Sequence, residues 1–382
     1  MPPLSLYVHV PWCVRKCPYC DFNSHNAPDA LPEDAYVDAL IADLEAALPS
    51  IWGRKIHTVF IGGGTPSLFS APAIERLLSA IRARVPLSPD AEITLEANPG
   101  TFERERFAGF FAAGVNRLSL GIQSFDDRFL RALGRVHDAS EARRAAEAAL
   151  MIFGNVNFDL MFALPEQSIT QARNDAAAAI AFAPPHLSFY HLTIEPNTLF
   201  HRHPPPLPDD DTAADIEDAV LQLLAHAGYV QYETSAHAKP GRECRHNLNY
   251  WRFGDYLGIG AGAHSKLSFA DRIVREVRWK QPKQYLDKVG EGCPCQEQSE
   301  VSWRELPCEF MLNALRLTEG VPTSLFGERT GMPLSIAAAP IAEATRRGLL
   351  EPDPFVIRPT ALGRRFLNDL QALFLPDRAR VP

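Results

Sequence analysis

The chain has 382 residues, of which 46% are hydrophobic and 22% charged, with a formal net charge of −8. These proportions are typical of a folded protein with a sizeable core and exclude a disordered or fibrous chain. The acidic balance argues against non-specific nucleic-acid binding. No apolar stretch reaches the ~18 residues that a membrane helix needs, and no signal peptide is evident. The seven cysteines show no pairing framework, so we expect a reducing cytoplasm.

The first two-thirds of the chain alternate short strands with longer helices, which is typical of a parallel sheet made of βα units. The expected strands cover residues 4–10, 57–61, 93–97, 117–122, 156–162 and 186–192. The expected helices cover residues 33–48, 71–84, 103–113, 140–152, 170–183 and 209–226. Six units are too few to close an eight-stranded barrel. We therefore predict an α/β fold with an open, partial (βα)6 barrel, whose chemistry lies at the carboxyl ends of the strands.

After residue 291 the pattern changes to shorter helices and one hairpin. The helices are expected at residues 304–317, 324–330, 336–347 and 361–373, and the hairpin at residues 350–358. This order is typical of a winged-helix-like α+β module. Because the module is not strongly basic, we interpret it as a cover or partner-docking domain and not as a DNA-binding domain.

Three cysteines, Cys13, Cys17 and Cys20, follow the first expected strand. Thiolates are the preferred ligands of iron–sulfur clusters, and a four-iron cluster normally takes four of them. Three cysteines on one short loop would leave one iron open to a substrate or cofactor. A zinc site completed by His9 or His25 is an alternative. Three unrelated buried thiols are the other alternative, which the tight spacing disfavours.

Two further motifs carry candidate binding residues. Gly62-Gly-Gly-Thr-Pro66 follows the second expected strand, where consecutive glycines let the backbone approach a ligand closely, although a tight turn alone would also explain them. His246, Tyr250 and Trp251 form a His-Asn-x-x-Tyr-Trp segment. Imidazole is a common axial ligand of haem iron, and aromatic rings can pack on a porphyrin face. A local hydrogen bond and core packing would explain the same three residues.

The cysteine spacing, with Tyr19 before the last cysteine, resembles the signature of the radical S-adenosylmethionine (SAM) superfamily. The stretch from Tyr7 to Phe22 more narrowly resembles the branch that contains oxygen-independent coproporphyrinogen III dehydrogenases and the haem chaperones of the HemW family. The dehydrogenases carry a further cysteine where this chain has Phe22. They also have an arm ahead of the cluster loop, for which the twelve residues before Cys13 leave no room. Both differences favour the HemW family.

The resemblance implies a [4Fe–4S] cluster on the three cysteines and SAM as the ligand of the open iron. One electron from the reduced cluster would then release methionine and a 5′-deoxyadenosyl radical. The residues that the resemblance assigns to SAM are Tyr7, Tyr19, Gly63, Gly64, Thr65, Glu96, Gln123, Arg135, Asp159, Thr193 and Ala263. It assigns haem to His246, Tyr250 and Trp251, and no catalytic residue is assigned.

The favoured function is therefore a haem chaperone that passes haem to an acceptor protein, such as a haem protein of the respiratory chain. A radical SAM coproporphyrinogen III dehydrogenase is the alternative, and whether the chain is an enzyme stays open. We divide the chain into the partial barrel (1–236), a segment with the haem motif (237–295) and the C-terminal module (296–382). We expect a cytoplasmic protein without a nucleic-acid partner or a transmembrane segment, and leave a peripheral membrane contact open.

Overall fold

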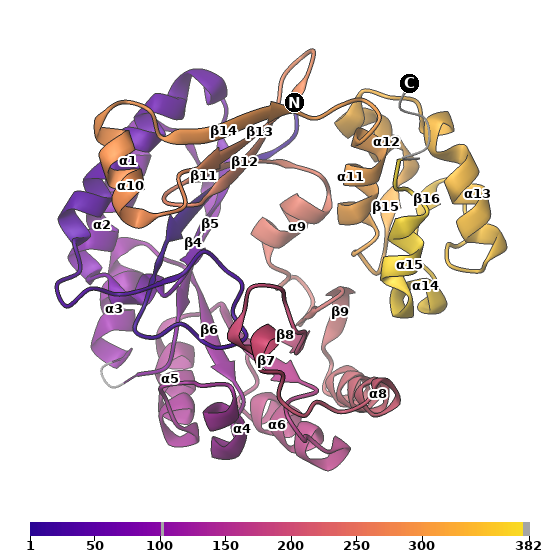
Figure 1. Ribbon diagram of the computed structural model, residues 1–382, viewed down its shortest axis with the longest axis horizontal. Helices are drawn as coiled ribbons and strands as arrows, with labels where there is room; N and C mark the ends of the chain where they lie inside the picture. The colour runs from indigo at the N-terminus through magenta and orange to yellow at the C-terminus, as the bar shows by residue number, and fades with distance from the viewer. Residues whose placement is uncertain (101–102, 377–382) are drawn as a thin grey trace.

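The computed structural model describes residues 1–100 and 103–376, and within them a single large sheet dominates (Figure 1). Its twelve strands run in the order β14-β13-β12-β11-β1-β4-β5-β6-β7-β8-β10-β9, and the sheet stays open. The six central parallel strands are those expected: β1 (Leu4–Val10), β4 (Ile56–Gly63), β5 (Leu87–Ala97), β6 (Arg117–Gln123), β7 (Val156–Phe162) and β8 (His186–His191). The prediction of an open α/β barrel of six units is confirmed.

The helices between these strands also follow the sequence pattern closely. They are α1 (Glu33–Ala47), α2 (Ala71–Arg84), α3 (Glu103–Ala113), α5 (Ala139–Ile152), α6 (Ile169–Ala181) and α8 (Asp210–His226), with the short α4 (Asp127–Ala132) before α5. Side-chain caps fix several of their starts: Asp138 and Glu141 form a capping box at α5, and Ser168 and Gln171 form one at α6. Such caps satisfy backbone N–H groups that would otherwise lack a partner.

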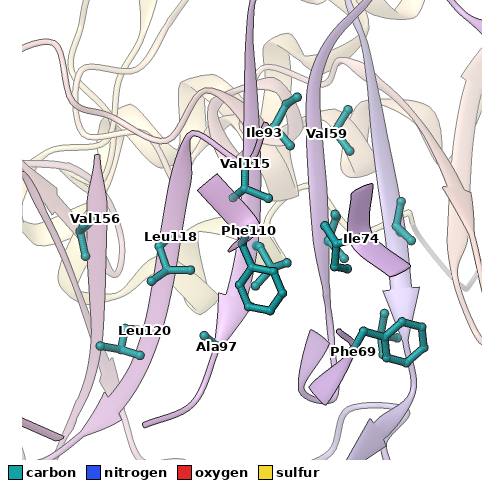
Figure 2. Close-up of a cluster of buried hydrophobic side chains, with 14 of the residues drawn as sticks. Val59, Phe69, Ile74, Ile93, Ala97, Phe110, Val115, Leu118, Leu120 and Val156 are labelled. Atoms are coloured by element: carbon teal, nitrogen blue, oxygen red, sulfur yellow. The ribbon is translucent and has the colours of Figure 1, made fainter. Parts of the chain in front are cut away.

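Strand residues that point toward these helices form the main core (Figure 2). On neighbouring strands Val59 pairs with Ile93, and Leu118 pairs with Val156, within one apolar cluster. Phe110 of α3 packs into the same cluster and is fully buried. Burial of such side chains is the main favourable term in folding, so this outer face of the sheet holds the barrel together.

The sheet continues beyond the six expected strands at both edges. β10 (Ala236–Ala238) and β9 (Val230–Glu233) extend it antiparallel next to β8. At the other edge β11 (Asp255–Ile259) pairs parallel with β1, and β12 (His264–Ser268), β13 (Ile273–Arg278) and β14 (Cys295–Glu300) follow antiparallel. The sequence pattern did not predict these strands, because they are short or, like β14, almost wholly polar.

The remaining short elements are β2 (Trp12–Cys13), β3 (His25–Asn26), α7 (Leu199–Arg202) and α10 (Pro282–Gly290), with single-turn helices at Leu48–Ile51 and Pro66–Leu68.

The C-terminal module has its own apolar core. It contains α11 (Leu306–Ala314), α12 (Thr323–Thr330), a turn at Leu334–Ala337, α13 (Ala338–Arg346), α14 (Ala361–Arg365) and α15 (Leu367–Ala372). Its two-stranded sheet joins β15 (Val321–Pro322) to β16 (Val356–Ile357), while one bridge, Leu350 to Pro359, closes the expected hairpin. The expected last helix divides into two at Phe366.

The module lies across the open side of the sheet, next to the short helix α9 (Arg245–Trp251) (Figure 1). Phe253, which follows α9, belongs to the module's core and packs edge-on against Phe310 of α11, with ring centroids 5.7 Å apart. An ion pair links Arg316 to Glu233 of β9 at 3.1 Å. The module therefore closes over α9, and α9 is held between the sheet and the module.

Within residues 1–100 and 103–376, no helix is both long and apolar enough to cross a lipid bilayer.

Candidate functional site

The inner face of the sheet is polar, whereas the outer face, which packs against the helices, is apolar. It carries Glu96 on β5, Ser119 on β6 and Asp159 on β7, all of which line one cavity of about 360 Å³. The cavity opens at the carboxyl ends of the strands, where Cys13, Cys17 and Cys20 also line it. Ligand sites of parallel βα folds lie at this end of the sheet. The cavity is therefore the candidate functional site.

The cysteine loop reaches over the cavity and is fastened at several points. The N–H of Cys20 donates to the carbonyl of Cys17 at 3.1 Å, which closes a tight turn. The N–H of Phe200 donates to the carbonyl of Pro18 at 3.0 Å, so α7 fixes the middle of the loop. All seven cysteines of the chain are free of disulfides. The three loop thiols are therefore available to bind iron together.

The three loop thiols line one cavity, where they lie close to one another. Among the described residues, no group of three or more histidine, cysteine or acidic side chains is placed to hold one metal ion. A cubane binds each thiolate on a different iron, so its cysteines stand farther apart than the ligands of one ion. Burial, the largest effect, raises the pKa of Cys13 and of Cys20, and the nearby Cys17 raises both further.

The two histidines of the zinc alternative are already engaged. The ring of His9 contacts the Tyr7 hydroxyl through Nδ1 at 3.0 Å and the carbonyl of Asn23 through Nε2 at 2.9 Å. His25 Nε2 contacts the Asn23 side chain at 3.3 Å. Burial lowers the pKa of His9 to about 4, which agrees with a neutral ring used for structure. Because both ring nitrogens of His9 are used, a zinc site completed by His9 is disfavoured.

The glycine segment is wedged against the residues before the cysteine loop. Gly63 has a φ of +115°, and a Cβ there would lie 2.5 Å from the His9 ring. A Cβ on Gly64 would lie 2.5 Å from the Trp12 carbonyl. The N–H of Gly64 donates to the carbonyl of Val10 at 2.7 Å. Glycine is therefore required at both positions, so that the segment can lie against His9 and Trp12 and present its backbone to the cavity.

Two carboxyl groups give the cavity its electrostatic character. Burial, and next Asp159, raise the pKa of Glu96 to about 8. Burial also raises the pKa of Asp159, which accepts hydrogen bonds at 2.8 Å from Ser119 and from Asn157. The N–H of Gly63 donates to Glu96 Oε2 at 3.0 Å. A positively charged ligand would offset the cost of ionising these buried acids, so the cavity suits a cation.

Arg135 supplies the opposite charge at another wall of the same cavity. Its guanidinium donates to Asn98 Oδ1 at 2.6 Å and to the carbonyl of Gly121 at 2.9 Å, and lies 3.6 Å from Cys17 Sγ. Such a fork suits a carboxylate next to the cluster loop. Gln123 lies beside it with a φ of +68°, a conformation that turns the chain at the end of β6. A ligand with both an ammonium or sulfonium group and a carboxylate would match both walls.

Most of the residues that the sequence assigned to SAM meet in this cavity. Those that line it are Tyr19, Gly63, Gly64, Thr65, Glu96, Gln123, Arg135, Asp159 and Thr193. Tyr7 lines a second cavity next to the first. Ala263 is buried and lines neither of the two.

The haem motif lies deeper in the barrel. His246 is 2% exposed, and its ring packs against Phe60 and Tyr250, with centroids 5.0 and 5.1 Å away. Its Nδ1 lies 2.8 Å from Thr58 Oγ1, and its Nε2 has no hydrogen-bond partner among the described residues. Burial lowers the pKa of His246 to about 3. Tyr250 lines the second cavity, while Trp251 packs under the Arg316 guanidinium at 4.3 Å.

Several lining residues were missed by the sequence reasoning. Asn98 bonds both Thr65 at 2.9 Å and Arg135, and so links two walls of the cavity. Its position directly after β5 could have revealed it, since the residues that end parallel strands meet at one edge. Tyr190 and His191, the last two residues of β8, and Glu195 in the loop after it also line the cavity. No motif in the sequence distinguishes these three from their neighbours.

The fold and the site define a class of protein. An open parallel barrel with three loop cysteines above a polar cavity is the arrangement of radical SAM proteins, and the profile of the Radical SAM superfamily matches residues 7–178. The profile of the HemN C-terminal domain matches residues 301–366, in the C-terminal module. The solved structure of the coproporphyrinogen III oxidase HemN from Escherichia coli superposes with a TM-score of 0.83 over 98% of this chain and 90% of that one. At 24% identity, this likeness shows the fold alone.

Curated relatives identify the family. The chain is 50% identical to a haem chaperone HemW from Escherichia coli over 99% of both chains. It is 34% identical to the one from Bacillus subtilis over 98% of this chain and 99% of that one. The chain therefore belongs to the HemW family of haem chaperones. The radical SAM assignment implies SAM and a [4Fe–4S] cluster, and the family name implies haem and a protein that accepts it.

Proposed function

We propose that the chain is a haem chaperone that carries a [4Fe–4S] cluster on Cys13, Cys17 and Cys20, binds SAM in the adjoining cavity, and delivers bound haem to an acceptor protein. One observation supports the proposal most strongly: the three thiols, the two buried acids and Arg135 surround one cavity in a chain of this family. The seven free cysteines agree with a reducing compartment such as the cytoplasm.

Each wall of the cavity has a distinct part in this proposal. When bound, the cluster supplies an open iron that the amino and carboxylate groups of SAM can chelate. Arg135 holds the carboxylate beside Cys17, and the glycine segment offers backbone carbonyl groups to the ammonium. Glu96 and Asp159 stabilise positive charge and accept hydrogen bonds from ribose hydroxyls. Tyr19 covers the site from the cysteine loop.

The test of cluster and cargo uses the full chain reconstituted anaerobically with iron and sulfide. Haemin is titrated in, and apomyoglobin then serves as the acceptor. We expect about four iron atoms per chain, a haem absorption band, and transfer of that band to myoglobin. A variant with serine at all three cysteine positions should lose the iron. Failure of the wild type to bind haemin would overturn the chaperone proposal.

A second assay separates the chaperone from the dehydrogenase alternative. The reconstituted protein is incubated anaerobically with dithionite, SAM and coproporphyrinogen III. We expect no protoporphyrinogen, because Phe22 stands where the dehydrogenases carry a cysteine. Catalytic turnover would instead establish the dehydrogenase.

A further inference from the structure

A second cavity of about 360 Å³ opens beside the first. The two share Phe22, Gly63 and Glu96, so a molecule in the second cavity would lie next to one in the first. Aromatic side chains form much of the lining of the second cavity, and they come from Tyr7, Tyr250, Tyr256 and Phe22. Polar side chains, among them Glu96 and His264, complete it, so its chemistry suits a large, flat ligand with polar groups at its edge.

The aromatic side chains of the second cavity form two sides: Tyr250 and Tyr256 are held in place by contacts, and Phe22 is exposed to solvent. Tyr250 and Tyr256 lie with ring centroids 4.4 Å apart, and the Arg275 guanidinium donates to the Tyr256 hydroxyl at 3.0 Å. Phe22 faces them from the cysteine loop and is 62% exposed. A planar ring system that covered this exposed phenylalanine would remove apolar surface from water, which is favourable.

One imidazole at this cavity is free to bind a metal. His264, the first residue of β12, is exposed, and its ring forms no hydrogen bond with any described residue. His9, the other histidine of the cavity, uses both ring nitrogens. His246 does not line the cavity and lies behind Tyr250. Neutral imidazole with an accessible nitrogen is the usual protein ligand of haem iron.

A cationic side chain lies near the same imidazole. Lys280 follows β13, in which Val277 pairs with His264, and its ammonium is close enough to act electrostatically on the His264 ring. Asn23 fixes this corner: its amide donates to the carbonyls of Ala261 and Lys280, both at 2.9 Å. An exposed lysine beside His264 suits the carboxylate of a porphyrin propionate.

We propose that the second cavity is the haem-binding face of the molecule, with His264 as an axial ligand of the iron and Tyr250 packed on the porphyrin. His246 is then a positioning residue that supports Tyr250 from behind. This inference rests on the proposed function, and it explains how haem and SAM would lie side by side across Phe22 and Glu96.

The experiment titrates haemin into the reconstituted full chain and into three variants, His264→Ala, His246→Ala and His226→Ala. His226 is an exposed histidine at the end of α8 and lines neither cavity, so it is the matched control. We expect His264→Ala to weaken haemin binding at least tenfold and to shift the Soret band, and free imidazole to restore the band. His246→Ala should weaken binding but keep the wild-type band. His226→Ala should change neither.

Different failures have different meanings. Haemin binding by the wild type with an unchanged band in His264→Ala would overturn this inference and leave the chaperone proposal standing. A band lost in His246→Ala but kept in His264→Ala would assign the ligand to His246 and also overturn it. No haemin binding by the wild type would overturn the proposed function itself. Thermal unfolding of each variant checks that the substitutions leave the fold intact.

Discussion

The two faces of the parallel strands perform different tasks. On β6, Leu118 and Leu120 point into the core beneath the helices, whereas Ser119 and Gly121 face the cavity. The outer face is apolar and holds the fold through burial. The inner face carries buried charges, which cost free energy unless they are paired or bound. Because side chains alternate along a strand, fold and chemistry are encoded by alternate residues of the same segments.

The inner face tolerates its charges because hydrogen-bond networks satisfy them. At the amino end of the strands, Glu92 accepts from the backbone N–H groups of Arg245 and His246, at 3.2 and 3.1 Å. Nearer the carboxyl end, Glu96 is satisfied less completely, with one hydrogen bond from the Gly63 N–H, and burial raises the pKa of Glu96 and of Asp159. The incompletely satisfied end is the one that forms the cavity. This contrast is expected where a ligand supplies the missing partner.

The largest expected effect comes from the outer face. Leu120→Ala removes a fully buried side chain from the core and should lower the free energy of unfolding by about 3 kcal/mol. The affinity of the folded protein for SAM should stay within twofold. Urea unfolding and calorimetric titration measure the two quantities. A large loss of SAM affinity with little loss of stability would break the proposed division between the faces.

The next effect concerns the charge of the inner face. In the SAM-free protein the folded chain holds a proton on Glu96 up to about pH 8, whereas an unfolded chain has lost it above the ordinary pKa of 4.5. Between these values the free energy of unfolding should therefore fall as pH rises, by roughly 1.4 kcal/mol per pH unit for one proton. Glu96→Gln removes this contribution.

Urea unfolding of both proteins from pH 6 to pH 8.5 measures the difference in slope. SAM should bind the wild type more tightly as the pH rises toward 8, because the ligand's positive charge favours the ionised carboxyl group. If the free energy of unfolding changed with pH at the same rate in both proteins, the pKa of Glu96 would not be raised by folding, which would contradict the account.

The smallest effect tests a single hydroxyl group on the inner face of β6, the strand that also carries Leu120. Ser119→Ala removes the hydroxyl that donates to Asp159 at 2.8 Å and accepts from Asn157 at 2.8 Å. The free energy of unfolding should change by about 1 kcal/mol, less than for Leu120→Ala. SAM affinity should fall severalfold, because Asp159 loses one of its fixed partners. A larger loss of stability than in Leu120→Ala would contradict the account.

The sequence predicted the parts of the molecule that have strong local signals. The bounds of β1, β7, α2 and α3 agree with the expected ranges, and Ser70 caps the start of α2. The cysteine loop and the glycine segment were found from spacing, and nine residues assigned to SAM line one cavity. These features are determined by residues that are close together in the sequence.

The remainder depends on contacts between distant segments. β14, with the sequence Cys-Gln-Glu-Gln-Ser-Glu, has no apolar alternation, and its pairing with β13 makes it a strand. Tyr7 faces the second cavity because β1 lies between β4 and β11, an arrangement that no local pattern shows. His264 was not assigned to haem for the same reason: it meets Tyr250 and Phe22 only in the folded chain.

The most direct test of the central claim is electron paramagnetic resonance of the reduced, reconstituted protein before and after SAM is added. If three cysteines hold a cluster whose open iron faces the cavity, SAM should change the g values of the cluster signal in the wild type. The same change should be weakened in Arg135→Ala, which keeps all three cysteines. A cluster signal that does not respond to SAM at saturating concentration would contradict the account.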